Sequence, residues 1–204
     1  MLLNICFFEI MLFISYVFYR HLAGKFNLRM KSKTLDKHVI DIIDLLIYGF
    51  IIYLFNFFKN NGLYFDKEYI LIYFISLVLF GFILEIPGVA TPLPKLKSWN
   101  YNKLIGISIL LILTYNFGKD IFIFNKRNIS LLIYLIVIII IACISSYHKN
   151  KFKTFHPHHW QIFWFISLVI IPISYSTKIL SAIYLSFFSH GIISYSAASI
   201  IKDN

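Results

Sequence analysis

Long runs of apolar residues fill most of this chain and limit what it can fold into. A helix needs about 20 apolar residues to cross the hydrocarbon core of a bilayer. Backbone amides inside lipid must be bonded within their own segment, so such runs are predicted to be α-helices even where Ile, Phe and Tyr abound. Seven runs can be delimited, approximately Met1 to Phe18, Val39 to Phe58, Tyr69 to Ile86, Leu104 to Phe124, Ser130 to Tyr147, Pro157 to Tyr175 and Ile179 to Ile201.

The composition agrees with a membrane protein. Hydrophobic residues make up 59% of the chain and charged residues only 14%, whereas soluble domains carry about 25% charged residues. The predicted fold is therefore an all-α, polytopic integral membrane helix bundle, with residues 1–204 forming a single transmembrane domain. The net charge of +10 does not indicate nucleic-acid binding. Its basic residues lie in short loops beside apolar runs, where they contact the bilayer and its anionic lipid head groups.

The number of spans has two readings. Basic residues follow the first run and none precedes it, which predicts an N-terminus outside. Gly118-Lys119-Asp120 interrupts the fourth run, so that segment either crosses the membrane or re-enters and leaves by the same face. The basic side has more Lys and Arg in both cases, so charge does not choose between seven and six spans. We expect seven, because Ile121 to Phe124 restores a full-length run.

A histidine cluster opens the sixth run, in the order His156-Pro157-His158-His159-Trp160. Pro157 suits the first position of a helix, and the positive end of the helix dipole favours neutral imidazoles. Neutral imidazole ligates metals and accepts protons, but a bound cation would need a carboxylate nearby. The candidate ligands of a divalent transition metal are therefore His156, His158 and His159, with Asp41, Asp44 or Glu85 completing the shell.

Other interpretations of these residues stay open. Trp160 and Trp164 could form an aromatic belt at the membrane surface that the histidines extend, or the cluster could bind lipid head groups. Asp41 and Asp44 could complement the helix dipole in the first turn of the second run. The His-x-His-His spacing of residues 156–159 resembles a histidine box of membrane lipid hydroxylases and desaturases, but the further spaced His pairs of those families are absent.

A second pattern lies in the last run. Ala182, Ser186, His190, Ser194 and Ala198 are four residues apart, so they form one small, polar stripe that predicts close helix packing. His190 falls near the middle of its run, and Glu9 lies at a comparable depth in the first run. An ionisable group at that depth is a functional candidate. We therefore take His190 and Glu9 as candidate catalytic residues that face the bundle interior, and we expect them to pair if the first and last runs are neighbours.

These patterns give two functional hypotheses. The first is a metal-dependent membrane enzyme that acts on a lipid or another hydrophobic substrate, with the histidine cluster as its centre. The alternative is a non-enzymatic membrane subunit, a transporter or a lipid head-group-binding protein. The two predict different outcomes for metal content and for substitution of His158 and His159.

Overall fold

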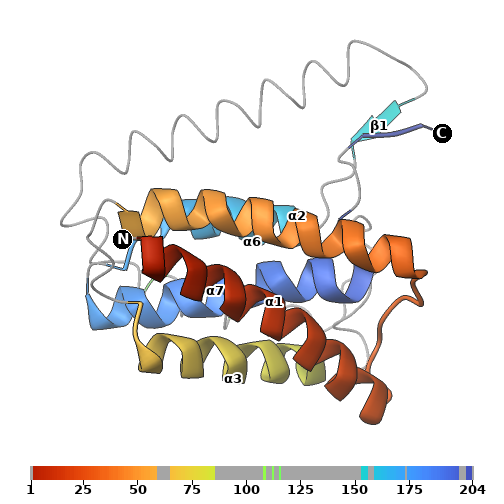
Figure 1. The fold of residues 1–204 in the computed structure, drawn as a ribbon, viewed down its shortest axis with the longest axis horizontal. Coiled ribbons are helices and arrows are strands. Elements are labelled where there is room, and N and C mark those ends of the chain that lie inside the picture. Colours follow the sequence, from red (N-terminus) through yellow and green to blue (C-terminus); the bar gives the residue numbers. More distant parts are fainter. Residues whose placement is uncertain are drawn as a thin grey trace.

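The computed structural model describes residues 2–58, 65–85, 153–155, 159–172, 174–197 and 201–203, together with positions 108, 112 and 115. Within these residues the fold is helical, which confirms the predicted all-α class, apart from a short antiparallel pairing of two strands (Figure 1). Apart from those three positions, the predicted runs at 104–124 and 130–147 lie outside the described residues. The elements are α1 (Leu2–Lys25), α2 (Leu35–Tyr53) with a π-helical continuation (Leu54–Phe58), α3 (Lys67–Ile83), β1 (Lys153–Phe155), α6 (His159–Val169), α7 (Tyr175–Tyr195) and β2 (Ile201–Asp203).

Helix α1 extends well beyond Phe18, where the first apolar run was expected to end. The added turns carry basic residues, and Lys25 in the last turn complements the negative end of the helix dipole. Asn27 adopts a positive φ of 53°, and the amide of Leu28 donates to the carbonyl of Ala23 at 2.9 Å. This is a Schellman-type ending, so local capping rather than hydrophobicity sets the end of α1.

Helix α2 begins four residues earlier than the run at Val39 predicted. Thr34 caps it by accepting from the amide of Lys37, and Asp36 occupies the first turn. The interpretation of Asp41 and Asp44 as first-turn residues is therefore wrong, because both lie deeper in the helix. Asp36 takes the position that complements the dipole.

The sixth predicted run is shorter than expected and the seventh begins earlier. Helix α6 ends at Val169 rather than near Tyr175, because Pro172 lacks an amide hydrogen and disfavours helical geometry in the residue before it. A capping box between Ser174 and Thr177 then starts α7. Helix α7 ends at Tyr195, so Ala198 of the stripe falls outside the described residues, and Ile201 belongs to β2.

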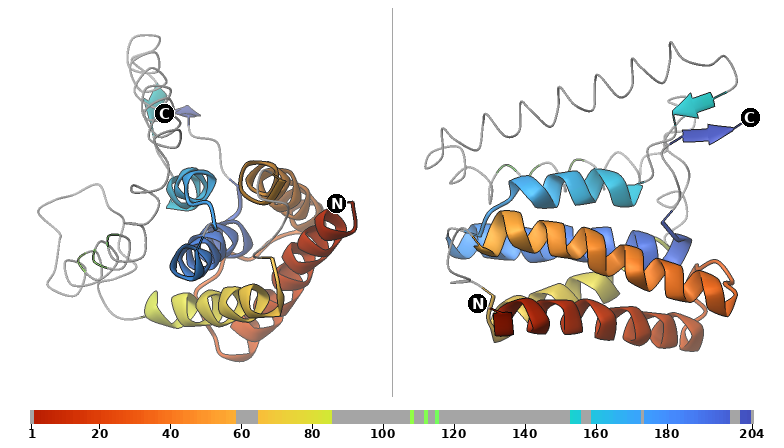
Figure 2. Two further views of the ribbon diagram at one scale, coloured as in Figure 1. Left: turned by 90° about the vertical axis from the view of Figure 1, so that its left-hand side faces the viewer. Right: turned by 45° about the horizontal axis from the view of Figure 1, so that its top comes forward.

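Helix α7 is the axis of the described bundle, with α1, α2, α3 and α6 arranged around it (Figure 2). Most of its side chains are buried, including the polar ones at its centre. A polar helix can occupy this place because the surrounding helices, and not α7, carry the apolar outer surface.

The contacts also fix the directions of the helices. Helix α3 runs parallel to α7, because Tyr69 meets Ser181 near their starts and Phe80 meets His190 near their ends. Helix α1 runs the same way, since Tyr19 contacts His190 and the amide of Lys31 just beyond α1 donates to the carbonyl of Ser194. Helix α6 runs in the opposite direction, with Trp160 beside Gly191.

Two described helices, Leu3–Lys25 and Leu35–Asn56, are long and apolar enough to cross a membrane. Helix α6 is apolar but short, and α7 is long but rich in Ser, Thr and Tyr. Within the described residues, two helices are therefore compatible with crossing a membrane.

Candidate functional site

His190 lies at the centre of a buried polar cluster. Its Nε2 atom lies 3.0 Å from the hydroxyl of Tyr19 and 3.2 Å from that of Ser194. The rings of Tyr19 and Phe80 meet the imidazole edge-on, each with its centroid at 5.0 Å. With 1% of its surface exposed, His190 faces the interior, as the stripe in α7 predicted.

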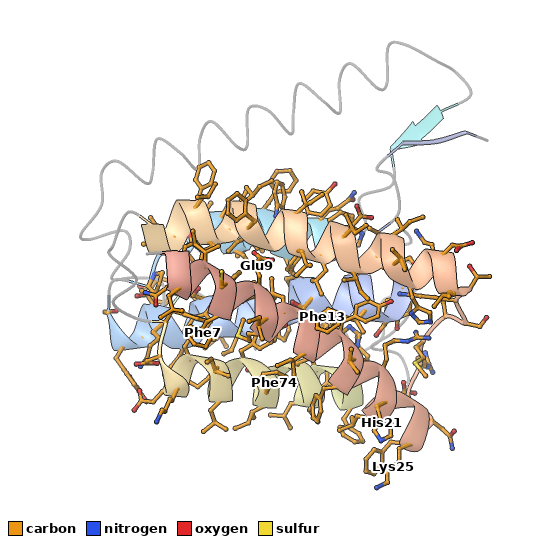
Figure 3. The ribbon with its side chains drawn as sticks, in the orientation of Figure 1. Phe7, Glu9, Phe13, His21, Lys25 and Phe74 are labelled. Atoms are coloured by element: carbon orange, nitrogen blue, oxygen red, sulfur yellow. The ribbon has the colours of Figure 1, made fainter. Side chains whose placement is uncertain are left out.

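Glu9 lies elsewhere. It is ten residues before Tyr19, about 15 Å along the axis of α1 at 1.5 Å per residue. Tyr19 is the α1 residue that meets His190, so the depth match suggested by the sequence does not produce a Glu9–His190 pair. Glu9 sits at the border between α1 and α2, only partly buried (Figure 3).

Further polar contacts line α7 towards its start. The hydroxyl of Tyr69 on α3 lies 3.1 Å from that of Ser181, and both side chains are buried. The hydroxyl of Tyr73 donates to Ser15 of α1 at 2.8 Å. Buried phenols of α3 thus find oxygen partners on α7 and α1, which satisfies groups that would otherwise be costly in an apolar interior.

A buried ion pair closes the other end of α7. Lys33 in the α1–α2 connection lies 2.8 Å from Asp41, and both side chains are almost fully buried. Lys33 also donates to the carbonyl groups of Ile192 and Ile193, at 2.9 and 2.8 Å. Burial lowers the pKa of Lys33, against the opposing effect of Asp41. The lysine therefore caps the last turn of α7 from outside the helix.

The three candidate carboxylates have different surroundings. Asp41 is paired with Lys33 and Lys37 and accepts the amide of Ala197. Glu85 lies 3.4 Å from the side chain of Arg29 and accepts its backbone amide. Asp44 is half-buried on α2, and no ion pair involves it among the described residues.

The histidine cluster is described only in part. His156 and His158 lie outside the described residues, and His159 is the first residue of α6, of which only the backbone is described. The next residue, Trp160, is buried against Tyr48, with ring centroids 5.2 Å apart. Among the described residues no group of three or more His, Cys, Asp or Glu side chains could hold a metal ion. The predicted metal site thus stays a prediction.

A second ion cluster lies at the opposite end of the bundle. The amine of Lys178 lies 3.0 Å from Asp66 and 2.6 Å from Glu68, joining the starts of α3 and α7. Burial lowers the pKa of Lys178, but the two carboxylates outweigh it and the pKa is raised. Burial raises the pKa of Asp66, yet hydrogen bonds from Tyr69 and Lys178 bring it below its ordinary value.

Sequence reasoning missed Tyr19 and Lys33 as functional partners. Tyr19 is one of 14 tyrosines, and its distance of 171 residues from His190 leaves no local signal. Lys33 resembles the exposed Lys31 beside it in every local respect. No family model, curated protein or solved structure matches this chain. Its function is therefore inferred from its own residues.

Proposed function

We propose that this chain is an integral membrane protein that binds anionic lipid head groups at its basic end. The observation that carries the proposal is the apolar outer surface of α1, α2 and α3. Soluble monomers rarely expose contiguous apolar patches beyond a few hundred Å². Here large apolar side chains cover three neighbouring helices on the side away from α7, among them Phe7, Ile10, Phe13, Val17, Ile43, Ile47, Phe50, Leu71, Ile75 and Leu79.

The helix directions support seven spans over six. Helices α1 and α7 are parallel, so an odd number of crossings from the first to the last is expected. Helix α6 begins at the end of the bundle where α3 finishes, because Trp160 and Phe80 both lie near the last turns of α7. An even number of crossings between α3 and α6 fits this arrangement, and we assign it to the two predicted apolar runs in that interval.

The two ends of the bundle differ in charge. At the end where α1 finishes, Lys25 and Lys31 are exposed beside the half-exposed Phe26, Arg29 is paired with Glu85, Asp36 is exposed and Asp41 is buried. At the opposite end, the exposed Lys67 stands beside the exposed Asp66 and Glu68. Basic residues next to an apolar belt attract anionic lipid, at about 1 kcal/mol per residue.

The test compares lipids and matched variants. In neutral detergent, added phosphatidylglycerol is expected to raise the melting temperature more than phosphatidylcholine does. The double variant Lys25→Gln/Lys31→Gln should bind phosphatidylglycerol more weakly. Its half-saturating concentration should rise by about fivefold per removed charge. Lys67→Gln at the opposite end is the matched control. An equal response to both lipids, or an equal loss in the control, would contradict lipid binding at the basic end.

One observation favours a second candidate, the metal-dependent enzyme. Helices α2 and α6 run parallel, with Tyr48 meeting Trp160 and Asn56 meeting Ser167. Asp44 precedes Tyr48 by one helical turn, and the histidine cluster immediately precedes Trp160. Asp44 thus lies near the depth at which the histidine cluster is expected. It is also the candidate carboxylate that forms no ion pair among the described residues.

Metal analysis of the purified protein tests this candidate. Zinc, iron, copper or manganese is expected in stoichiometric amounts, and Asp44→Asn and His159→Ala should each reduce the metal content by about tenfold or more. Glu85→Gln is the matched control, because Glu85 is already engaged by Arg29. Absence of stoichiometric metal in the unmodified protein would remove this candidate and leave the lipid-binding proposal intact.

A further inference from the structure

Glu9 occupies an unusual depth for a carboxyl group. It precedes Arg20 by eleven residues in one continuous helix, which corresponds to about 16 Å at 1.5 Å per residue. Arg20 donates to the carbonyl of Lys31 in the connection at the basic end. If that end lies at the membrane surface, Glu9 lies inside the hydrocarbon core, between Arg20 and the opposite end of the bundle, where the preceding Phe8 meets Phe65 with ring centroids 5.4 Å apart.

The immediate surroundings of Glu9 are apolar. Phe8 before it is buried towards Gly49 of α2, while Ile10 and Phe13 lie on the exposed side of α1. Glu9 is therefore at the edge of the seam between α1 and α2, in agreement with its place in Figure 3. Its Oε1 atom is shielded from solvent and has no hydrogen-bond partner within the described part of the chain.

The acidic residues that form ion pairs in the described part of the chain show the contrast. Asp41 and Glu85 at one end, and Asp66 and Glu68 at the other, each lie beside a lysine or arginine. Glu9 has no such ion pair among the described residues. The titratable and charged groups on the helices around Glu9 are the Cys6 thiol, the phenols Tyr16, Tyr48, Tyr53, Tyr69, Tyr73 and Tyr184, Asp44 of α2, Lys67 at the start of α3, and Lys178 of α7, whose amine is held by Asp66 and Glu68.

A charged carboxylate without a cation is strongly disfavoured in hydrocarbon, whereas the neutral acid is tolerated and can still exchange its proton. We propose that Glu9 is a membrane-embedded proton-binding site, reached from the lipid side of the α1–α2 seam. Its ligand is a proton, and the group is a carboxylic acid at neutral pH. This inference rests on the proposed insertion of α1 into the bilayer.

A hydrophobic carbodiimide is the probe for such a site. The proton of the acid passes to one carbodiimide nitrogen and the carboxyl oxygen bonds to the central carbon. The adduct then rearranges to a stable N-acylurea without a leaving group or any change in oxidation state. Dicyclohexylcarbodiimide added to the full chain in liposomes is expected to modify Glu9, with less modification as the pH rises and the acid loses its proton. Glu9→Gln should abolish the modified peptide.

A water-soluble carbodiimide provides the matched comparison. It is expected to modify Glu68, whose side chain is 63% exposed, and to spare Glu9. Failure of dicyclohexylcarbodiimide to modify Glu9 at any pH would overturn the proposal. Protection of Glu9 by sodium at constant pH would also overturn it, because the ligand would then be a metal cation.

Alkaline carbonate extraction of the same membranes separates this inference from the proposed function. If the protein resists extraction and Glu9 reacts with neither reagent, the insertion stands and the proton site is wrong. If carbonate releases the protein and the water-soluble reagent modifies Glu9 as fast as Glu68, the insertion itself is wrong. Resistance to extraction together with selective modification by the hydrophobic reagent supports both.

Discussion

The imidazole of His190 contacts two hydroxyl groups and three aromatic rings, all from the helices packed around α7 or from α7 itself. His190→Ala would leave a cavity and remove the imidazole partner of the Tyr19 phenol. We expect a loss of about 2–4 kcal/mol in the free energy of unfolding. Thermal unfolding in detergent measures it, with the exposed His21→Ala on α1 as the control. Equal melting temperatures for the two variants would contradict a structural role for the buried ring.

Lys33 and Asp41 form a pair whose members depend on each other. Lys33→Met would leave Asp41 buried with only the more exposed Lys37, and we expect a loss of about 3 kcal/mol or more. The double variant Lys33→Met/Asp41→Asn removes both charges and should recover part of that loss. Lys31→Met on the exposed neighbour is the control. If the double variant is less stable than Lys33→Met, the expectation is wrong, and Asp41 stabilises the fold by more than neutralising Lys33.

These residues mark how far a sequence can predict a site. The spacing of four between Ser186, His190 and Ser194 predicts the packed face of α7, because it depends on one helix only. The partner of His190 depends on the relative depth of two helices, and the estimate from run lengths selected Glu9 instead of Tyr19. The error is the physical consequence of an α1 that extends several residues beyond its apolar run.

Helices α6 and α7 approach so closely that glycine is required at one position. A Cβ atom on Gly191 would meet the side chain of Trp160 and lie 3.0 Å from its Cα atom. Gly191→Ala is therefore expected to lower the melting temperature, because a backbone must move to make room. Gly24→Ala is the matched control, since its Cβ would meet only the flexible end of Met30 at 3.7 Å. Similar melting temperatures for both variants would mean that the two helices separate without penalty.

The cluster of Lys178 with Asp66 and Glu68 should stabilise the bundle within a limited pH range. The pKa of Asp66 is lowered, so its contribution is present above its ordinary pKa and is lost as the pH falls through the lowered value. The pKa of Lys178 is raised, so its contribution persists below its ordinary pKa and is lost as the pH rises through the raised value.

Lys178→Gln should therefore reduce the melting temperature most near neutral pH and less at both extremes. Because both carboxylates are largely exposed, the effect at neutral pH should be about 1 kcal/mol or less. Lys67→Gln on the exposed start of α3 serves as the control. A reduction that does not vary with pH would assign the effect of Lys178 to packing.

Helix boundaries followed capping rather than apolar content. Asp66, Thr34 and Ser174 begin their helices, and Pro172 separates α6 from α7 inside what reads as nearly continuous hydrophobic sequence. Five of the seven predicted runs are helices among the described residues, and hydrophobicity alone was enough to predict them. Their ends could not be predicted in this way, since single residues decide them: a side chain that accepts an amide at the start, and a proline or a left-handed residue at the finish.

The direction of each helix leads to a topology that labelling can test. With Cys6 and Cys143 replaced by serine, single cysteines at Lys31, Lys67 and Lys151 can be reacted with a membrane-impermeant maleimide in sealed vesicles. Seven spans predict that Lys31→Cys and Lys151→Cys react from the same side and Lys67→Cys from the other. Reaction of Lys31→Cys and Lys151→Cys from opposite sides would favour six spans.

The central position of α7 has a consequence for how the protein is made. Among the described helices, α7 is the last to leave the ribosome, yet the others arrange their buried tyrosines around it. Until it arrives, the inward phenols of α1 and α3 have no histidine or serine of α7 to meet. Because α7 is itself too polar to favour lipid on its own, under the proposed insertion it would enter the membrane against helices already in place. Assembly of this bundle is thus completed by its least hydrophobic element, and a nascent chain stopped before Tyr175 would lack the axis around which the rest is organised.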